Sequence, residues 1–292
     1  MNTKESQKFK KPIFIVGSAR SGTVFLGELL KSHSEIHCLI EEPKIFDFAS
    51  HIALNPIYKE SHENYICTHL YKLYQRAWNI ENLDCRKCSN VCRQKYKNII
   101  NDELIRCQSS LPKLYADKSH QHILNIDILL KIFPDARFIH ITRDGKDVVA
   151  SMLKHPGVLS WFSTKYINQD SSWPNPWFGV SSFEHFKEWE KWSLAKKCAL
   201  RWVSWTEKGL EKKVSLSQNQ WLDIRYEELV TNPKVTYSQI FSFLNLERGK
   251  ESLAKAFPGS VGKWKKGLSS LELEDVLSVA SKQLVKLGYS LG

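Results

Sequence analysis

The sequence predicts an α/β protein in which a central parallel β-sheet lies between two layers of helices. Short segments rich in β-branched and aromatic residues alternate with longer segments whose apolar residues recur at helical spacing. Glycine or proline separates most of these segments. Because 42% of the 292 residues are hydrophobic, the chain can bury a large core. We therefore expect a flexible N-terminus over 1–10 and a single domain over 11–292.

The first elements are a strand, a glycine turn and a helix. The run "IFIV" at 13–16 suits a buried strand, and apolar residues from Val24 to Leu30 recur at helical spacing. A second strand is expected at "EIHCLI", residues 35–40. The alternation continues with a helix at 123–133, a strand at 136–142, a helix at 144–154, one or two helices over 183–210, a strand at 221–225, and helices at 232–244 and 272–287. In such sheets, ligands bind beyond the carboxyl ends of the strands.

Two segments interrupt this alternation. Residues 41–114 are polar and contain most of the cysteines, so we predict a helical insertion after the second strand. Residues 155–182 carry six aromatic rings among proline, asparagine and serine, which predicts a long aromatic loop. Long loops in compact domains often bind ligands. Packing of these rings over the core is an equally good interpretation.

The chain is basic, with a formal net charge of +11. Such a surface attracts anions, including phosphates, sulfated glycans, nucleic acid and anionic lipids. Because the basic residues are spread along the chain without a nucleic-acid-binding motif, nucleic acid is not an expected partner. No apolar run approaches the roughly 18 residues of a membrane span, and the lysine-rich start lacks the apolar core of a signal peptide. These features predict a cytoplasmic protein without a transmembrane segment.

The turn after the first strand, "GSARSGT", has the composition of a phosphate-binding loop. Gly17 and Gly22 let the backbone turn tightly. The amides of Ser21, Gly22 and Thr23 are expected to face an anion at the start of the following helix. Arg20 adds a charged donor. The alternative is an ordinary connection between a strand and a helix.

The same turn departs from the phosphate loop of nucleoside triphosphatases. That loop places a lysine after its last glycine, whereas Thr23 follows Gly22 here. The strand at 136–142 is followed by Arg143 and not by an aspartate placed to hold magnesium. An ATPase or GTPase is therefore not expected. A phosphate-type ligand would instead need fixed cations and amides.

Three motifs resemble those of the sulfotransferases that use 3′-phosphoadenosine 5′-phosphosulfate: "GSARSGT" at 17–23, "FPDARFIHITRDGKDVVAS" at 133–151 and "GSVGKWKKGLS" at 259–269. Their order along the chain matches that family. The resemblance implies a P-loop-like nucleotide-binding core. It also implies that the first loop binds the 5′-phosphosulfate through Arg20, Ser21, Gly22, Thr23 and Val24. Phe25 stands where cytosolic members place an adenine-stacking tryptophan.

By the same resemblance, the other two motifs bind the 3′-phosphate of the donor. Arg143 and Ser151 belong to the second motif, and their spacing places them on nearly the same face of a helix. The negative charges of Asp144 and Asp147 would also be stabilised at the positive N-terminal end of this helix. The third motif lacks the arginine–lysine pair that usually precedes its first glycine. The contacts expected from it are Ser260, Lys263 and Lys265.

The resemblance implies in-line transfer of a sulfonate group to an acceptor hydroxyl. The basic surface and the long aromatic loop are compatible with a small-molecule or glycan acceptor, and we favour a carbohydrate hydroxyl. Arg20 and Lys118 would stabilise the charge that develops on the departing phosphate oxygen. Two other function classes fit parts of the sequence. One is a small-molecule kinase with a degenerate phosphate loop. The other is a non-catalytic module that binds a nucleotide or a polyanion.

Three residues are candidates for the general base. Glu42 precedes a proline, as in the "EP" pattern of bacterial members, whereas Glu41 matches better by residue count from Arg20. His120 stands in "DKSH", where cytosolic members carry a catalytic histidine. A histidine needs little adjustment of its pKa near neutral pH, while a glutamate needs burial or a neighbouring carboxylate. We favour Glu42, then His120, then Glu41, and all three stay open.

Four of the seven cysteines have a spacing compatible with a structural zinc site. These are Cys85, Cys88, Cys92 and Cys107. The second half of the usual paired CxxC pattern is absent. Free thiols on the helical insertion are therefore the leading alternative.

Overall fold

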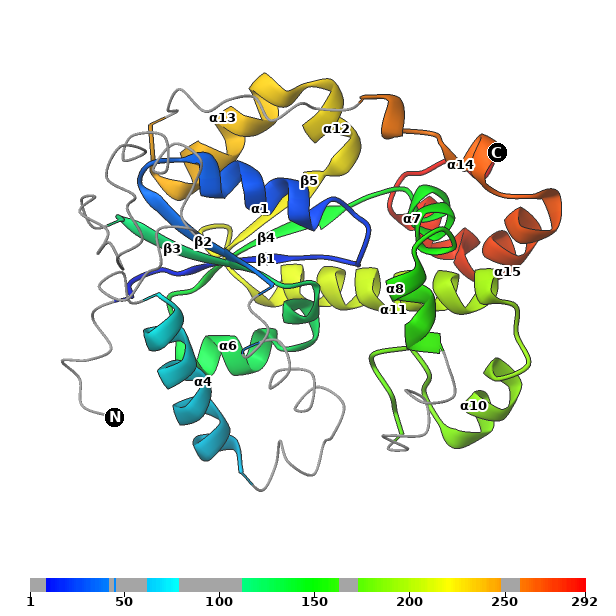
Figure 1. Ribbon diagram of the computed structural model, residues 1–292, viewed down its shortest axis with the longest axis horizontal. Helices are drawn as coiled ribbons and strands as arrows, with labels where there is room; N and C mark the ends of the chain where they lie inside the picture. The colour runs from blue at the N-terminus through cyan, green and yellow to red at the C-terminus, as the bar shows by residue number, and fades with distance from the viewer. Residues whose placement is uncertain (1–8, 42–44, 46–61, 79–111, 163–172, 248–257) are drawn as a thin grey trace, which may run out of the picture.

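The computed structural model describes residues 9–41, 45, 62–78, 112–162, 173–247 and 258–292. Its centre is a five-stranded sheet in the order β2-β3-β1-β4-β5, in which every neighbouring pair is parallel. The strands are β1 (Ile13–Val16), β2 (Ile36–Ile40), β3 (Leu114–Lys118), β4 (Arg137–Thr142) and β5 (Trp221–Arg225). Helices cover both faces of this sheet (Figure 1). The predicted α/β class with a central parallel sheet is confirmed.

β1 lies in the middle of the sheet, and its sequence reflects that position. Phe14 and Val16 belong to the core on one face, whereas Ile13 and Ile15 belong to the core on the other face. All four side chains are completely buried. A strand buried on both faces is a continuous hydrophobic run, as "IFIV" is.

The helices form two layers and a cap at one end of the sheet (Figure 1). One face is covered by α1 (Thr23–Ser32), α12 (Tyr226–Thr231) and α13 (Pro233–Leu244). The other face is covered by α4 (Glu63–Ala77), η3 (His120–Leu124), α6 (Ile126–Ile132) and α11 (Leu194–Ser215). The remaining elements form the cap near the carboxyl ends of β1 and β4. They are α7 (Gly145–Met152), α8 (Pro156–Leu159), η4 (Ser160–Phe162), α10 (Phe183–Trp189), η5 (Pro258–Ser260), α14 (Trp264–Gly267) and α15 (Ser270–Lys286).

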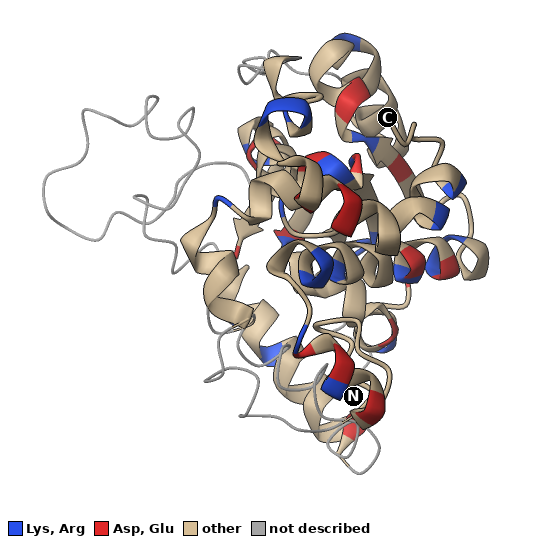
Figure 2. Ribbon diagram, turned by 90° about the vertical axis from the view of Figure 1, so that its right-hand side faces the viewer, with Lys and Arg blue, Asp and Glu red and all other residues tan. Residues whose placement is uncertain are grey.

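Charged residues are interspersed over the helices in the view of Figure 2, where Lys and Arg alternate with Asp and Glu. No helix in the described ranges has the length and apolar composition required to cross a bilayer. Within the expected insertion at 41–114, the described part contains the helix α4. The expected aromatic loop at 155–182 begins with α8 and η4, and a bridge joins Asn175 to Val180. The expected domain boundaries stay predictions.

Two predicted helices are divided by polar residues. The segment at 123–133 forms η3 and α6, and Asn125 separates them by donating its side-chain amide to the carbonyl oxygen of Gln121 at 3.0 Å. The segment at 183–210 forms α10 and α11. Ser193 begins α11 because its hydroxyl accepts the amide of Lys196 at 3.2 Å.

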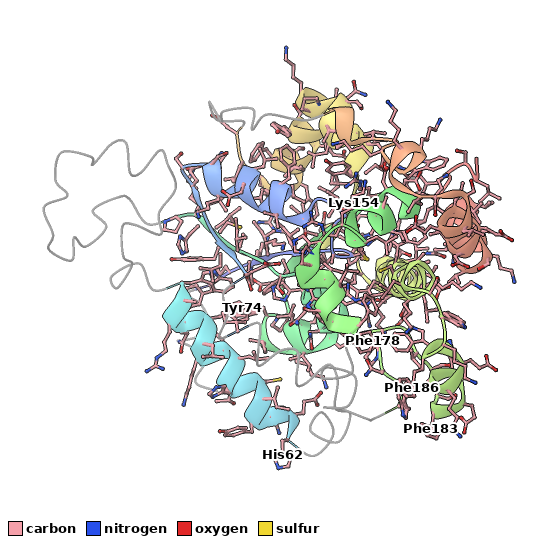
Figure 3. All side chains as sticks on the ribbon, turned by 45° about the vertical axis from the view of Figure 1, so that its right-hand side comes forward. His62, Tyr74, Lys154, Phe178, Phe183 and Phe186 are labelled. Carbon is pink, nitrogen blue, oxygen red and sulfur yellow. The ribbon has the colours of Figure 1, made fainter. Side chains whose placement is uncertain are left out.

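The sequence analysis does not predict β3, because two of its five residues are charged. Asp117 and Lys118 are each 1% exposed. The Asp117 carboxylate accepts hydrogen bonds from the Tyr74 hydroxyl at 2.9 Å and from His122 Nε2 at 2.8 Å. Figure 3 shows Tyr74 on the side of α4 that faces the sheet. These hydrogen-bond partners allow a charged residue to be buried in β3. Because they come from other elements, the sequence of β3 alone does not predict a buried strand.

We expect Gly17→Ala to lower the free energy of unfolding by about 2 kcal/mol or more. Gly17 has φ 151°, and a Cβ there would lie 2.5 Å from the carbonyl oxygen of Ile141 on β4, so one of the two backbones must move. Urea unfolding measures the change. Gly259→Ala is the control, because nothing lies within 4 Å of its Cβ position. Equal losses in both variants would contradict this account of the loop.

Candidate active site

The loop between β1 and α1 has left-handed backbone at two positions. Arg20 has φ 70° and Gly22 has φ 96°. A Cβ on Gly22 would lie 2.4 Å from the ring of Tyr226, so glycine is required there. The expectation that the Ser21 amide faces an anion is wrong. This amide donates to the carbonyl oxygen of Ser18 at 3.1 Å and closes the turn. The following amides at the N-terminus of α1 form the positive end of that helix.

Arg143 connects all three motifs. Its Nη1 donates to the carbonyl oxygen of Arg20 at 3.1 Å, and its Nη2 donates to the carbonyl oxygen of Ser260 at 2.7 Å. The ring of Tyr226 lies 4.4 Å from the guanidinium carbon, and its hydroxyl is 2.7 Å from Ser260 Oγ. Because both hydrogen-bond acceptors are neutral carbonyls, the guanidinium keeps its positive charge for an anionic ligand.

Asp147 holds the third motif against the second. Its carboxylate accepts the backbone amides of Gly262 and Trp264, both at 2.8 Å, and lies 3.8 Å from Arg143 Nη2. The side chain of Asp147 is completely buried. The sequence predicts for this residue a favourable charge near a helix N-terminus and nothing more. The neighbouring Asp144 does cap α7, since its Oδ1 accepts the amide of Lys146 at 2.9 Å.

A cavity of about 300 Å³ lies where these motifs meet. It is lined by Arg20, Arg143, Asp147, Ala150, Ser151, Lys154, His155, Ser260 and Lys263. Arg20 Nε donates to Ser151 Oγ at 3.1 Å, and burial, together with the charge of Arg143, lowers the pKa of Arg20. Arginine and lysine predominate in this lining, and its carboxylate already accepts two amides. The cavity therefore suits an anion.

The cavity brings together predicted site residues from all three motifs and adds four others, Asp147, Ala150, Lys154 and His155. The next four residues do not line the cavity: Ser21 and Gly22 end the loop, and Thr23 and Val24 begin α1. Phe25 packs against the core beneath α1, and Lys265 Nζ lies 5.7 Å from the Trp264 ring, away from the lining. Lys154 and His155 line the cavity without having been predicted. Figure 3 shows Lys154 beyond the end of α7. The sequence signal for them is a basic pair that follows the second motif after two apolar residues.

A second cluster joins the ends of β2 and β3. Lys118 Nζ lies 2.5 Å from Glu41 Oε1, and His120 Nδ1 lies 3.2 Å from the same oxygen. The backbone of Glu41 has φ 52°, and its amide donates to the carbonyl oxygen of Lys118 at 2.8 Å. Lys118 and His120 are buried, whereas the side chain of Glu41 is 44% exposed. Of these three groups, Glu41 is the one that a substrate can reach.

The electrostatics of this cluster keep Glu41 ionised. Hydrogen bonds from His120 and Lys118 lower the pKa of Glu41 to about 2. Burial lowers the pKa of His120 to about 4, and burial also lowers the pKa of Lys118. The charge of Glu41 raises the pKa of Arg20 against the larger effect of burial. Arg20 therefore responds to the charge of Glu41 in the cluster as well as to that of Arg143 in the cavity.

Two sets of expected site residues lie outside the described residues. Glu42, the first candidate base, is one of them. The other set comprises the possible zinc ligands Cys85, Cys88, Cys92 and Cys107. Within the part of the chain that the structure describes, no group of three or more His, Cys, Asp or Glu side chains is placed to hold a metal ion. The Glu42 and zinc assignments stay predictions.

We expect Asp147→Ala to lower the free energy of unfolding by about 2–4 kcal/mol, because the buried amide of Trp264 and the partly buried amide of Gly262 lose their acceptor. Urea unfolding measures the change. Asp135→Ala is the matched control, since Asp135 accepts one exposed amide, that of Lys11, at 2.9 Å. The control should lose less than about 1 kcal/mol. Similar losses in both variants would show that Asp147 does not anchor the third motif.

The chain matches the model of the sulfotransferase family over residues 12–177 and 178–250. Protein-tyrosine sulfotransferase A of Caenorhabditis elegans is 20% identical to it over 237 residues, which cover 80% of this chain and 50% of that protein. An uncharacterized protein of Aquifex aeolicus is 26% identical over 185 residues, covering 63% of this chain and 21% of that protein. The chain thus spans half the length of the nematode relative and about a fifth of the bacterial one.

Two solved structures share the fold. The sulfotransferase domain from the curacin biosynthetic pathway aligns with a TM-score of 0.54 and 19% identity, covering 97% of this chain and 99% of that chain. The sulfotransferase domain from the Synechococcus PCC 7002 olefin synthase aligns with a TM-score of 0.54 and 16% identity, covering 98% of each chain. The family match includes the loop after β1 and the residues after β4, which meet at Arg143. The chain belongs to the sulfotransferase family.

Proposed function

We propose that this chain transfers a sulfonate group from 3′-phosphoadenosine 5′-phosphosulfate to an acceptor hydroxyl. The observation that carries the proposal is the meeting of three motifs around Arg143, in one electrostatic environment with Glu41 and Lys118. Family membership supports the same reaction. So do the names of the nematode relative and of the two structural neighbours.

The donor carries a 3′-phosphate and a 5′-phosphosulfate, so it needs positive groups at two places. We assign the 3′-phosphate to polar residues of the cavity, namely Arg143, Ser151, Lys154, Ser260 and Lys263. The planar guanidinium of Arg143 presents several donors to phosphate oxygens. The 5′-phosphosulfate would lie against Arg20 and the N-terminus of α1, where backbone amides favour an anion. These groups fit a donor held by fixed cations and amides.

We assign the role of general base to Glu41, because it is the group of this cluster that a substrate can reach. Its pKa of about 2 makes it a weak base, unlike the raised pKa expected of a glutamate base, so it would take the proton only as sulfonate transfer makes the acceptor hydroxyl acidic. As transfer proceeds, the acceptor oxygen bonds to sulfur, the bond between sulfur and the phosphate oxygen breaks, and the acceptor proton passes to the Glu41 carboxylate. His120 and Lys118 hold this carboxylate in place. Lys118 and Arg20 stabilise the charge on the departing phosphate oxygen. His120 is 5% exposed and acts as a positioning residue, and Glu42 stays the alternative base.

Isothermal titration calorimetry with adenosine 3′,5′-bisphosphate tests the donor site. We expect binding without magnesium and a loss of about 30-fold or more in Arg143→Met, because charge-assisted hydrogen bonds are lost. The control is Arg76→Met, since Arg76 is exposed on α4. Binding of ATP with magnesium, without binding of the bisphosphate, would support the kinase alternative. A response to heparin alone would support a polyanion-binding module.

Transfer assays with labelled donor and a panel of phenols and glycosides test the base. We expect Glu41→Gln to lower kcat by about 10²- to 10⁴-fold. Because the pKa of Glu41 is about 2 and that of His120 about 4, both are deprotonated at neutral pH. The kcat/KM profile should therefore be level between about pH 5.5 and 8.

Glu35→Gln is the matched control for this experiment, because Glu35 directly precedes β2 and pairs with Lys113 away from the cluster. It should leave kcat unchanged. A fall in kcat/KM below about pH 6.5 would indicate a histidine base with an ordinary pKa and would contradict the assignment. Retention of kcat in Glu41→Gln, with its loss in Glu42→Gln, would transfer the role to Glu42.

A further inference from the structure

Arg201, on α11, is a buried arginine that the proposed reaction does not use. It is 0% exposed. Its Nε donates to the carbonyl oxygen of Trp177 at 2.9 Å. Neither Nη1 nor Nη2 has a hydrogen-bond partner among the residues that the structure describes. Because a guanidinium has five N–H donors and unsatisfied buried donors are costly, this group needs an acceptor that the described residues do not provide.

Three indole rings surround the guanidinium. Its carbon lies 3.9 Å from the centroid of the Trp205 ring and 4.5 Å from those of Trp161 and Trp177. Trp205 is itself held by its Nε1, which donates to the carbonyl oxygen of Pro176 at 3.2 Å. The ring faces stabilise the positive charge but do not replace hydrogen bonds at the edge of the guanidinium. Burial lowers the pKa of Arg201 to about 9, so the group stays charged at neutral pH.

The same indole rings contact His120. The centroid of its ring lies 5.5, 5.7 and 5.8 Å from those of Trp161, Trp177 and Trp205. The charge of Arg201 adds to the effect of burial in lowering the pKa of His120. Since His120 also contacts the Glu41 carboxylate, Arg201 lies close to the proposed base. It does not line the donor cavity.

We propose that Arg201 determines acceptor specificity by binding a carboxylate that the acceptor carries. This inference rests on the proposed function, because the hydroxyl of the same acceptor has to reach Glu41. The Nη1 and Nη2 groups lie in one plane and match the two oxygens of a carboxylate. The indole rings pack against the body of the acceptor. Trp161 is the partly exposed ring of the three, so the acceptor would enter past it.

The acceptor class that follows is a compound with both a hydroxyl and a carboxylate. A hydroxyaryl acid and a uronic acid glycoside both meet this description. Each has a planar or ring-shaped body that an indole face can cover. A neutral phenol or a neutral glycoside would leave Arg201 without its acceptor, and we expect weaker binding of such compounds.

Titrations followed by tryptophan fluorescence test the proposal on protein saturated with adenosine 3′,5′-bisphosphate. The probes are two matched pairs: 4-hydroxyphenylacetate with its methyl ester, and phenyl glucuronide with phenyl glucoside. We expect one acid or both to bind at least about tenfold more tightly than the neutral partner. The pair in which the acid binds more tightly shows whether the acceptor is a hydroxyaryl acid or a uronic acid glycoside. Arg201→Met should abolish the preference and change the affinity for the neutral probe by less than about threefold.

Lys197→Met is the matched control. Lys197 lies about one turn earlier on α11, its Nζ is 4.7 Å from the Trp189 ring, and it donates to the carbonyl oxygen of Glu190. The control should keep the preference for the acid. Near-UV circular dichroism checks folding, and Arg201→Lys replaces Arg201→Met if the latter does not fold. Lysine keeps the charge without the planar pair of donors, so the preference should fall there as well.

Equal affinity of the wild-type protein for acid and neutral probe in both pairs would overturn the proposal, as would a preference that survives both Arg201 variants. Bisphosphate affinity, measured on the same samples, separates this inference from the proposed function. Normal bisphosphate binding without a preference for the acids overturns the role of Arg201 alone. Absence of bisphosphate binding overturns the proposed sulfotransfer, and the acid preference is then measured without the nucleotide.

Discussion

The guanidinium of Arg143 is the feature on which the rest of the site depends, because it joins segments that are far apart in the sequence. β1 and β4 are parallel neighbours, with Val16 opposite His140, so both strands end at the same edge of the sheet. The loop after β1 therefore meets the residue after β4. Asp147, one turn further along, adds the third motif through two main-chain amides. These contacts fix the shape of the cavity without neutralising Arg143 with a close ion pair.

Positive charge in a partly buried site costs free energy, and the fold offsets this cost in different ways. Glu41 neutralises Lys118 at 2.5 Å. Aromatic faces cover two other cations, since Tyr226 lies against Arg143 and three indole rings lie against Arg201. Such contacts stabilise a cation by about 0.5–2 kcal/mol, which is less than an ionic partner provides. An anionic ligand would meet the remaining electrostatic demand, and its binding would then stabilise the folded chain.

Sequence periodicity predicts most of the sheet, because β1, β4 and β5 are apolar or alternating runs bounded by turns. It fails for β3, whose buried Asp117 depends on Tyr74 and His122 from other elements. The spacing of the motifs predicts Arg20, Arg143 and Ser151, which do meet. The roles of Asp147 and Arg201 are not visible in the sequence, since each depends on a contact with a distant segment. The sequence likewise does not decide between the adjacent Glu41 and Glu42 as the base. In the structure, the left-handed backbone of Glu41 accompanies the contacts of its carboxylate with Lys118 and His120.

The cavity at Arg143 and the guanidinium of Arg201 are both positively charged, but they have different surroundings. We therefore expect them to bind different kinds of anion. The cavity at Arg143 is lined by four cationic side chains, so it suits a phosphate with more than one negative charge. Arg201 is a single cation among indole rings, and a dianion there would bring an uncompensated charge into an apolar environment. A carboxylate with an apolar body matches both the charge and the rings. In the proposed reaction, this difference in electrostatics would keep donor and acceptor apart, and Glu41 and His120 connect the two regions.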